Sequence, residues 1–551
     1  QRELRETPGV TALIYDQTCA AEKRRRRKRG DLPDPAMRVF INEMACEGCG
    51  DCSAKSNCLS VVPVETEFGR KRAIDQFSCN KDYSCIAGFC PSIVTVEGGT
   101  LRKGKGVPED ALDFVPLPEP HLPDLAAPYG MLIAGIGGTG VVTLGALIGM
   151  AAHLEGKSVS VLDMTGLAQK GGAVLSHVRL ADSQDKLHAV RIATGEADLV
   201  LGCDILVAVS DEALAKTQAG FSKAIVNTGQ AITGDFVRNP DHPFPLAAME
   251  QQLRDAVGAD AADFLDATRL ASILVGDAIM TNMFVSAAAL IRAIELNAVA
   301  VEDNKRAFLW GRRAAFDPEG VEKLARAHEP DLPAHRPSAN LDEAIARRRD
   351  ALTAYQDSAY AHRYTGFVER VRAAENALLP GSTLVSEAVA RSYYKLLAYK
   401  DEYEIARLYT DPEFARALAA SFAGNFTLRF HLAIPVLSRT APAAGEPKKR
   451  SYGPWLMSAF RLLAPLKFLR GTPADLFGYG AERRLERRLI EEYEATLEAI
   501  LPELRADNIA LAAEIARLPE SIRGYGPVKE RSAAAARSRL AELMQSITTG
   551  G

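Results

Sequence analysis

The sequence has 551 residues, which predicts about three to four domains, because one hydrophobic core rarely serves a chain of this length. Hydrophobic residues make up 47% of the chain and charged residues 25%, with a formal net charge of -4, so nothing global indicates a nucleic-acid-binding protein. Neither an apolar run of about twenty residues nor a secretory signal pattern appears, so we expect a cytoplasmic protein that does not cross a membrane.

The N-terminal segment begins at Gln1 and enters the apolar run "GVTALIYDQTC" almost at once. The run predicts a strand, and a start of this kind predicts that the chain is one part of a larger polypeptide. The basic stretch "EKRRRRKRG" follows at residues 22–30. A solvated basic helix or turn, nucleic-acid binding, and docking of an acidic electron carrier all account for it.

Seven of the nine cysteines crowd into one short region, and a cytosolic chain of this size rarely uses disulfides, so they are candidate metal ligands. In "CEGCGDC", the residues Cys46, Cys49 and Cys52 are each separated by two residues, which places three thiolates along one tight loop. An iron–sulfur cluster requires this loop and a remote Cys-Pro, which Cys90 supplies. In the bacterial ferredoxin arrangement the runs interleave, so Cys58 is expected to serve the second site.

The second run, "CNKDYSCIAGFCP", repeats the frame of the first, but Asp82 stands where the second cysteine is expected. The second site would consist of Cys58, Cys79 and Cys85, with the Asp82 carboxylate or solvent as the fourth ligand. Oxygen is a harder ligand than thiolate and holds iron less firmly. We therefore expect one complete 4Fe–4S cluster and a second cluster with a labile corner, for which a three-iron form is the alternative.

Between the two runs, "VVPVETEFGRKRAID" alternates as a β-hairpin does. Zinc is the alternative occupant of CxxC pairs, but a zinc site takes four ligands, and seven interleaved cysteines with a terminal Cys-Pro exceed that need. The spacing therefore favours iron–sulfur clusters. The two remaining cysteines, Cys19 and Cys203, lie alone in apolar contexts and are predicted to be buried thiols.

A glycine-rich turn follows in "MLIAGIGGTGVVTLG", between a predicted strand and a predicted helix, and its candidate ligand-binding residues are Gly135, Gly137, Gly138 and Gly140. Such a turn lets backbone N–H groups approach an anion at the helix N-terminus. The strand "SVSVLD" ends at Asp163, where a residue that binds an adenosine ribose is expected. Taken alone, this pattern predicts an NAD(P) enzyme, and it leaves open which anion is bound, if any.

Further strands are predicted at "DILVAVS", "KAIVNTG" and "AVLSHVRL", so residues 128–330 predict a Rossmann-like, doubly wound α/β domain after a linker at 101–127. From residue 331 the chain is rich in Ala, Arg, Glu and Leu at helical spacing, which predicts an α-helical domain over 331–551. A linker at 440–454 interrupts this domain. No self-contained catalytic motif appears, so the catalytic residues stay unknown.

With these pieces in order, the chain resembles the 2-oxoacid:ferredoxin oxidoreductases, most closely the fused indolepyruvate ferredoxin oxidoreductases of bacteria. The resemblance covers nearly the whole chain. The matching segments are "LIYDQTCAAEKRRRRKRG", "CEGCGDC", "ETEFGRKR", "CNKDYSC" with "GFCPS", "GIGGTGVVTLG" with "AQKGGAV", "AYKDEYEIARLYTD", "FHLAIPVLSR", "LRGTPADLFGYGAERRLERRLI" and "IRGYGPVK".

The resemblance implies the end of a thiamine-diphosphate domain at residues 1–38, a ferredoxin-like 4Fe–4S module at 39–100, a gamma-type Rossmann-like domain, and an α-helical C-terminal domain. It implies oxidative decarboxylation of an aryl 2-oxoacid such as indolepyruvate with coenzyme A, and transfer of electrons through the clusters to ferredoxin. Thiamine diphosphate and Mg would be bound mainly by domains upstream of Gln1, so this chain alone is expected to be inactive. We also expect a homo-oligomer and no nucleic-acid partner.

Two alternative functions predict different ligands for this chain. An NAD(P)-linked iron–sulfur reductase would bind NADH tightly and lose this binding on replacement of Asp163, but the gamma-type domain that the resemblance implies is not a nicotinamide site. Its glycine-rich loop would instead pack on the thiamine domain or assist coenzyme A. A zinc-stapled scaffold or nucleic-acid-binding module on residues 22–90 would contain zinc and bind nucleic acid with a steep salt dependence.

Overall fold

A computed structural model describes residues 2–549 except 15, 17, 103–105, 108–116, 118–124, 167–171, 277–289, 330–335 and 434–448. Most of the predicted linker at 101–127, and most of the one at 440–454, lie outside the described residues. The chain forms two compact units, which we call the α/β unit and the cysteine–helix unit. The α/β unit comprises residues 1–34, 103–233 and 242–330, and the cysteine–helix unit comprises residues 35–102, 234–241 and 331–551.

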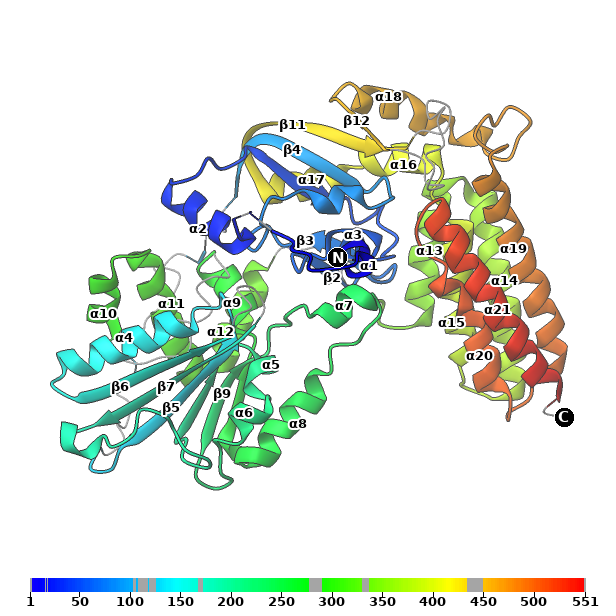
Figure 1. Cartoon of the computed structure of the whole chain (residues 1–551). Coiled ribbons are helices and arrows are strands. Elements are labelled where there is room, and N and C mark those ends of the chain that lie inside the picture. The colour runs from blue at the N-terminus through cyan, green and yellow to red at the C-terminus, as the bar shows by residue number, and fades with distance from the viewer. Residues whose placement is uncertain are drawn as a thin grey trace. The chain divides into compact units, whose positions relative to one another are not determined.

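The α/β unit is built on a six-stranded sheet in the order β10-β9-β8-β5-β7-β6 (Figure 1). Its strands are β5 (Tyr129–Ile136), β6 (Ser158–Thr165), β7 (Ala173–Ala181), β8 (Leu199–Gly202), β9 (Lys223–Asn227) and β10 (Ala262–Leu265). Its helices are α1 (Arg2–Glu6), α2 (Ala20–Arg29), α4 (Val141–Leu154), α5 (Ile205–Ala208), α6 (Asp211–Leu214), α8 (Leu246–Val257), α9 (Ala267–Leu274), α10 (Leu290–Asn297), α11 (Val301–Phe316) and α12 (Pro318–His328).

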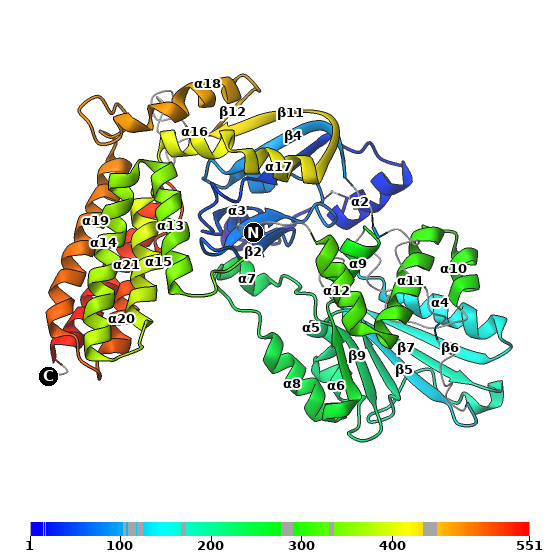
Figure 2. The ribbon, with the colours of Figure 1, turned by 180° about the vertical axis from the view of Figure 1, so that it is seen from behind.

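Helices cover both faces of this sheet, as Figures 1 and 2 show. Successive residues of a strand point to opposite faces, so Ile133 packs in one core with α4 and α9–α12, while Leu132 packs in the other with α5, α6 and α8. Strands β5, β8, β9 and β10 are parallel, as the α/β prediction requires. Strand β7 is antiparallel to both of its neighbours, so the sheet is mixed.

Two predicted strands in this unit are wrong. "DILVAVS" is the short helix α5, because Asp204 caps its N-terminus by accepting a hydrogen bond from the Val207 N–H, and the strand β8 ends just before it. The described residues of "GVTALIYDQTC" form no strand, and Val10 and Ile14 are exposed. Cys19 is likewise exposed, whereas Cys203 is buried as predicted. The basic stretch is helical and forms most of α2.

The cysteine–helix unit combines the cysteine-rich segment with the C-terminal region. Its strands are β1 (Met37–Ile41), β2 (Val61–Val64), β3 (Lys71–Ile74), β4 (Ile93–Leu101), β11 (Phe422–Leu432) and β12 (Arg450–Tyr452). Its α-helices are α3 (Asp51–Ser56), α7 (Gly234–Arg238), α13 (Leu341–Tyr355), α14 (Ser358–Leu378), α15 (Leu384–Leu397), α16 (Glu402–Thr410), α17 (Pro412–Ser421), α18 (Leu456–Leu463), α19 (Ala481–Ile500), α20 (Ile509–Arg517) and α21 (Pro527–Thr549).

The predicted hairpin is confirmed, since β2 and β3 pair antiparallel over four residue pairs. The prediction that residues 331–551 are wholly helical is wrong, because β11 and β12 extend the β1-β4 pair to a four-stranded antiparallel sheet. Strand β12 also lies inside the predicted linker at 440–454. Alternating residues of β4 and β11 bury one face of this sheet against α16, α17 and α18.

The rest of the C-terminal region packs as a helical bundle of α13–α15 and α19–α21 around one hydrophobic core (Figure 2). Its helix starts follow the capping rules, because the side chains of Asn340 and Asp357 accept backbone N–H groups at the starts of α13 and α14. Among the described residues, no helix has the length and hydropathy that would let it span a bilayer.

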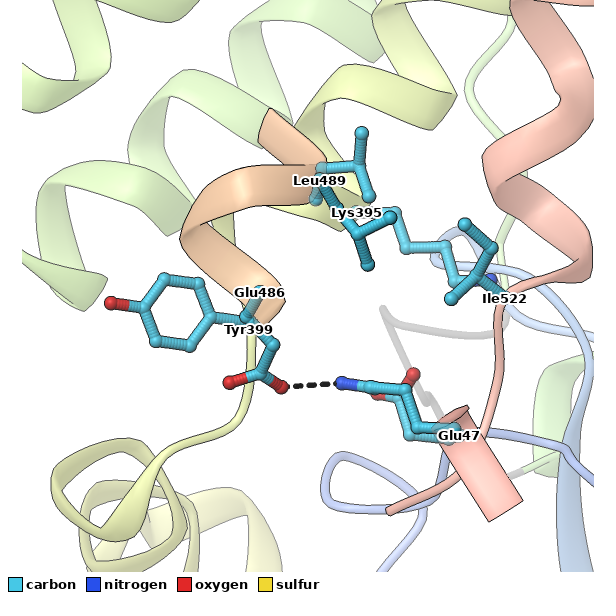
Figure 3. A pocket seen from close by; sticks show the side chains of 8 residues that line it. Glu47, Lys395, Tyr399, Glu486, Leu489 and Ile522 are labelled. Atoms are coloured by element: carbon cyan, nitrogen blue, oxygen red, sulfur yellow. Dashed lines mark hydrogen bonds and ion pairs between the residues drawn. The ribbon is translucent and has the colours of Figure 1, made fainter. Parts of the chain in front are cut away.

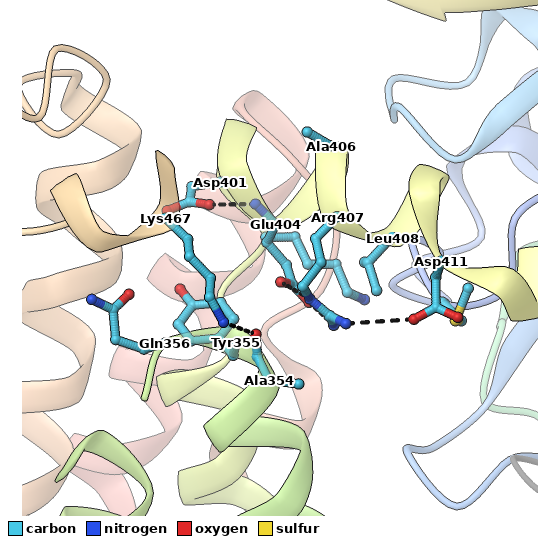
Figure 4. Close-up of polar contacts among 12 residues, drawn as sticks. Ala354, Tyr355, Gln356, Asp401, Glu404, Ala406, Arg407, Leu408, Asp411 and Lys467 are labelled. Carbon is cyan, nitrogen blue, oxygen red and sulfur yellow. Dashed lines mark hydrogen bonds and ion pairs between the residues drawn. The ribbon is translucent and has the colours of Figure 1, made fainter. Parts of the chain in front are cut away.

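A buried polar cluster fixes the segment between the bundle and α16. The Asp401 carboxylate caps α16 and accepts two hydrogen bonds from the Arg470 guanidinium, which lies over the Tyr355 ring at 3.7 Å. Figure 4 shows Arg407 beside Glu404 on the same helix. These contacts hold in place the chain that immediately follows Lys400, a residue of the site described next.

Candidate metal centre

The structure brings Cys46, Cys49, Cys52 and Cys90 together. The first two lie in the loop after β1, Cys52 lies in the first turn of α3, and Cys90 follows the short 3₁₀ helix Ser84–Ala87. Gly48 gives the loop its shape: its φ is +67°, and a side chain there would overlap the Arg70 carbonyl of the hairpin. These four cysteines, which we call the first set, therefore lie where the loop packs directly against the hairpin.

These four thiols interact electrostatically. Burial, together with the neighbouring charges of Cys90 and Cys46, raises the pKa of Cys49 to about 12, which favours the neutral thiol. Burial and Cys90 also raise the pKa of Cys52, while Arg72 acts in the opposite direction. Because the thiolate is the form that binds metal, four thiols held in this way require positive charge at their centre to ionise together.

The structure also groups the second set. Burial, together with the charges of Cys79, Cys58 and Asp82, raises the pKa of Cys85 to about 12. Cys85 is buried, Cys58 and Cys79 are half-buried, and Asp82 is exposed. The division of the cysteines into two interleaved sets is thus the one that the spacing indicates, and metal ligation itself stays a prediction.

The loop around Asp82 has an unusual backbone conformation. Lys81 and Tyr83 have positive φ angles of 55° and 65°, which non-glycine residues adopt only when surrounding contacts hold them. Lys81 donates to the Pro35 carbonyl at 3.0 Å, and the Tyr83 hydroxyl donates to the Met37 carbonyl at 2.9 Å. One oxygen of Asp82, Oδ1, accepts hydrogen bonds from the N–H and hydroxyl of Ser84.

Within the part of the chain that the structure describes, no three His, Cys, Asp or Glu side chains lie close enough to hold one metal ion. A single zinc ion needs its thiolates about 2.3 Å from one centre. An iron–sulfur cluster has several metal and sulfide atoms between its thiolates, so it requires them to stand farther apart.

Cations from distant parts of the chain surround the first set. Lys71 of the hairpin and Lys400 both lower the pKa of Cys46, although burial raises it most strongly. Lys400 also donates to the Cys46 carbonyl at 3.2 Å and pairs with Glu47. No sequence pattern predicted these lysines as part of the site, because lysines are common and 354 residues separate Lys400 from Cys46.

A small pocket lies beside this loop, where it meets the helical bundle (Figure 3). Its charged lining residues are Glu47, Lys395, Glu486 and Lys529, of which Lys529 and Glu486 form an ion pair at 2.6 Å. Burial lowers the pKa of Lys395 well below its ordinary value, and its ammonium group donates to the carbonyls of Pro519 and Glu520. The pocket is balanced in formal charge.

Two backbone N–H groups of the glycine-rich turn donate to carbonyls of the α/β unit itself. The N–H of Gly137 donates to the Gly172 carbonyl at 2.7 Å, and the N–H of Thr139 donates to the Ile136 carbonyl. A Cβ at Gly135 would lie 2.8 Å from the Cβ of Cys203, so this glycine permits close packing. Gly138 and Gly140 have φ angles of +102° and +91° and form the turn itself. That the loop binds a ligand stays a prediction.

The strand order does not favour the NAD(P) alternative. Asp163 is exposed on β6, the edge strand, and β7 lies between β6 and β5. In a dinucleotide-binding fold, the strand that carries the ribose-binding acid lies next to the strand that carries the glycine-rich turn. Asp163 and the glycine-rich turn are therefore not placed as that fold requires.

Comparison with known proteins assigns the chain to a family. A family model described as pyruvate ferredoxin/flavodoxin oxidoreductase matches residues 130–314. The indolepyruvate oxidoreductase subunit IorB of Methanothermobacter thermautotrophicus is 30% identical over 201 residues, which are 34% of this chain and 98% of that protein. The chain belongs to the 2-oxoacid:ferredoxin oxidoreductase superfamily.

Other members of the superfamily match shorter stretches. The IorB subunit of Pyrococcus horikoshii is 34% identical over 73 residues, and the match spans 35% of that protein. The gamma subunit of a keto/oxoacid ferredoxin oxidoreductase from Geobacter sulfurreducens matches 34% of this chain and 98% of its own at 22% identity and a TM-score of 0.24. The 2-oxoglutarate:ferredoxin oxidoreductase of Magnetococcus marinus matches 38% of this chain and 33% of its own at 15% identity and a TM-score of 0.26.

The C-terminal region of this oxidoreductase chain matches a second family model. This model is described as a family of unknown function, DUF6537, and it covers residues 341–542. The match spans nearly all of the helical bundle and the strands β11 and β12. The region therefore has a recognisable sequence family but no function attached to it.

Proposed function

We propose that this chain is the electron-transferring portion of an indolepyruvate-type 2-oxoacid:ferredoxin oxidoreductase. Cys46, Cys49, Cys52 and Cys90 hold one 4Fe–4S cluster. The second cluster is held by Cys58, Cys79, Cys85 and Asp82, where solvent is the alternative to Asp82 as fourth ligand. The observation that carries the proposal is the grouping of the cysteines, in which each remote cysteine lies with the other run, as ligands of two interleaved clusters do.

The donor groups of the first set fit a cluster. Four thiolates carry four negative charges, and buried charges of one sign are stable together only with positive charge among them. Iron supplies this charge inside the cluster, and Lys71, Arg72 and Lys400 supply more around it. The second set has three thiols and one carboxylate, and a carboxylate is a hard ligand, so this set fits a cluster with one weaker corner.

Each bound cluster supplies one-electron transfer between the oxoacid site and an external carrier. The chain's own residues hold the thiolates, exclude water and fix the charge near them. Buried Val39, Ile41, Val61 and Ile93 pack against cysteines of both sets and limit the access of water to them, whereas Asp82 of the second set is exposed. A low-dielectric surrounding of this kind strengthens the action of every nearby charge on the cluster potential.

The substrate and the partners belong to the same proposal. The relatives named indolepyruvate oxidoreductase support an aryl 2-oxoacid as substrate, with coenzyme A as the acyl acceptor and ferredoxin or a similar carrier as the electron acceptor. Thiamine diphosphate and Mg would be held by other domains or subunits, so we expect oxidation of the oxoacid only from the complete assembly. The test is coenzyme-A-dependent reduction of ferredoxin by indolepyruvate, with pyruvate and 2-oxoglutarate as comparison substrates.

The first measurement is the content of iron and acid-labile sulfide per chain after anaerobic purification, with EPR spectra before and after reduction. We expect about seven to eight irons and two interacting signals. About four irons would leave one cluster and contradict the role of the second set. Zinc without iron would overturn the assignment.

Replacing Asp82 by cysteine is expected to make the fourth iron of the second cluster resistant to oxidative loss, because a thiolate binds iron more firmly than a carboxylate. The measurement is the EPR signal of three-iron clusters after controlled oxidation, which should be large in the native chain and small in Asp82→Cys. Asp82→Ala is the matched variant that removes the oxygen ligand, and it should lose iron faster than the native chain. A native cluster that already resists oxidation contradicts a labile corner.

A further inference from the structure

The C-terminal region holds the backbone of the first cysteine set from several directions. The Lys400 ammonium donates to the Cys46 carbonyl at 3.2 Å, and the Tyr525 hydroxyl donates to the adjacent Ala45 carbonyl at 2.5 Å. On the other side of the set, the Tyr409 hydroxyl donates to the carbonyl of Pro91, which follows Cys90. All three donors come from residues beyond 331, so the C-terminal region fixes both ends of the first set.

The turn "RGYGP", residues 523–527, approaches the same set closely. Gly524 has a φ of +98°, and a Cβ at this position would lie 3.4 Å from the Cβ of Cys49. Gly526 has a φ of +48°, and a Cβ there would lie 2.6 Å from the Phe89 ring. The two glycines permit this turn to lie directly against the cysteine loop, with the Tyr525 side chain buried between them.

A second lysine of the C-terminal region reaches the peptide between the two sets. Lys449 precedes β12, and its ammonium donates to the Gly88 carbonyl at 2.7 Å and to the Ile86 carbonyl at 3.1 Å. Burial lowers its pKa, and the charges of Cys90 and Cys52 act against that decrease, so Lys449 lies within electrostatic reach of the first set. The ammonium group bonds to main-chain carbonyls, and the Asp51 carboxylate acts on it less strongly than Cys90 and Cys52 do.

The two sets differ in the cations that act on them. The thiols of each set raise one another's pKa values, but Lys71 and Lys400 also act on Cys46, and Arg72 acts on Cys52. The largest charges on Cys85 come instead from the members of its own set, Cys79, Cys58 and Asp82. Reduction adds one electron and therefore one negative charge to a cluster, so nearby positive charge favours the reduced form and nearby negative charge disfavours it.

We propose that the C-terminal region, which matches a family without an assigned function, forms the outer wall of the first cluster site, and that Lys449 is the positioning residue through which it raises that cluster's reduction potential above that of the second cluster. This inference rests on the proposed function, because it needs both clusters. It gives the electron a favoured direction: the first cluster, enclosed by the C-terminal region, is the more easily reduced of the two.

The test is a potentiometric titration of the full chain, followed by EPR. In Lys449→Gln the amide keeps a donor for the carbonyls of Gly88 and Ile86 but loses the charge. In surroundings with an effective dielectric constant of about 20, loss of one nearby charge is expected to lower the reduced-to-oxidised ratio of the first cluster about tenfold, which is about 59 mV for one electron. The second cluster should shift less, and Lys449→Arg should restore the native potential.

The matched control is Lys467→Gln, which removes a lysine that also donates to a backbone carbonyl, that of Ala354, away from both sets. It should leave both potentials unchanged. An unchanged first potential in Lys449→Gln with full iron content overturns the inference and leaves the proposed function standing, whereas a native chain without iron overturns the proposed function itself.

If Lys449→Gln does not retain its first cluster, the variant Glu47→Gln tests whether charges of the C-terminal region affect the potential of that cluster. Glu47→Gln leaves the Lys400 charge without its carboxylate partner, so the potential of the first cluster should rise in this variant. An unchanged or lower potential would contradict the role of the C-terminal charges.

Discussion

Replacing Cys49 by alanine is expected to remove the first cluster and to abolish electron transfer to ferredoxin. The variant leaves Cys46, Cys52 and Cys90, which are three of the four thiolates that a 4Fe–4S cluster requires. The iron content should fall from about eight to about four per chain, and the interaction between the two EPR signals should disappear. The measurement is iron and sulfide content together with the EPR spectrum of the reduced chain.

The control for this experiment is Cys19→Ala, which removes an exposed thiol that lies outside both sets. This variant should keep its full iron content and its electron transfer. Retention of both cluster signals in Cys49→Ala would contradict the assignment of ligands to the first set. Loss of all iron would instead indicate that the second set depends on the first.

Replacing Arg348 by methionine is expected to destabilise the cysteine–helix unit by about 3–5 kcal/mol. Arg348 lies on α13, is 2% exposed and forms an ion pair with Glu67 of the hairpin turn, which is also buried. It donates to the Glu67 main-chain carbonyl as well, and lies over the Phe68 ring. The variant removes the closest cation from the buried Glu67 carboxylate and leaves it the Ser338 N–H and the Arg347 guanidinium at 4.0 Å, and this loss of compensation is the origin of the cost.

The measurement is hydrogen exchange of the amides in α13 and in the β2–β3 hairpin, which reports opening of this unit even when the whole chain does not unfold in one step. Arg349→Met is the matched control, because Arg349 is the next residue, is exposed and pairs with Asp350 at the surface. Its effect should stay within about 0.5 kcal/mol. The double variant Glu67→Gln/Arg348→Met should recover much of the loss, and an equal loss in the double variant would contradict the explanation.

The Arg348–Glu67 ion pair should also make the stability of the hairpin depend on pH. Burial alone would raise the pKa of Glu67, but hydrogen bonds from Arg348 and Ser338 lower it below its ordinary value of 4.5. A carboxylate with a lowered folded-state pKa stabilises the fold above the unfolded-state pKa, and this contribution is lost as the pH falls through the folded-state value. Acid below about pH 4.5 should therefore increase exchange in the native hairpin and have little further effect in the double variant.

Much of the local structure followed from the sequence because its signals are short in range. The hairpin at β2 and β3, the strand–turn–helix of β5 and α4, and the bundle helices were each predicted from periodicity and turn residues within the same segment. "DILVAVS" was predicted wrongly because a short apolar run fits a strand and a buried helix equally well, and the N-capping contact of Asp204 decided between them.

The strands β11 and β12 could not be predicted in the same way. Strand β11 pairs with β4, from which it is separated by more than 300 residues, and this pairing depends on a partner strand that no local pattern identifies. The C-terminal region was therefore predicted as helices alone. For the same reason no local pattern indicated that Tyr525 or Lys449 would contact the cysteine-rich segment.

By itself, the sequence determined the two cysteine runs, their interleaved spacing and the departure at Asp82, because ligand spacing along a loop is a local property of the chain. Only the tertiary structure decided what surrounds the first set. Lys400, Lys449 and Tyr525 reach it from positions about 350 to 480 residues away in sequence, and long-range packing alone brings such groups together. The chemistry of the ligands is thus local, whereas the charges that would set the cluster potential come from the fold.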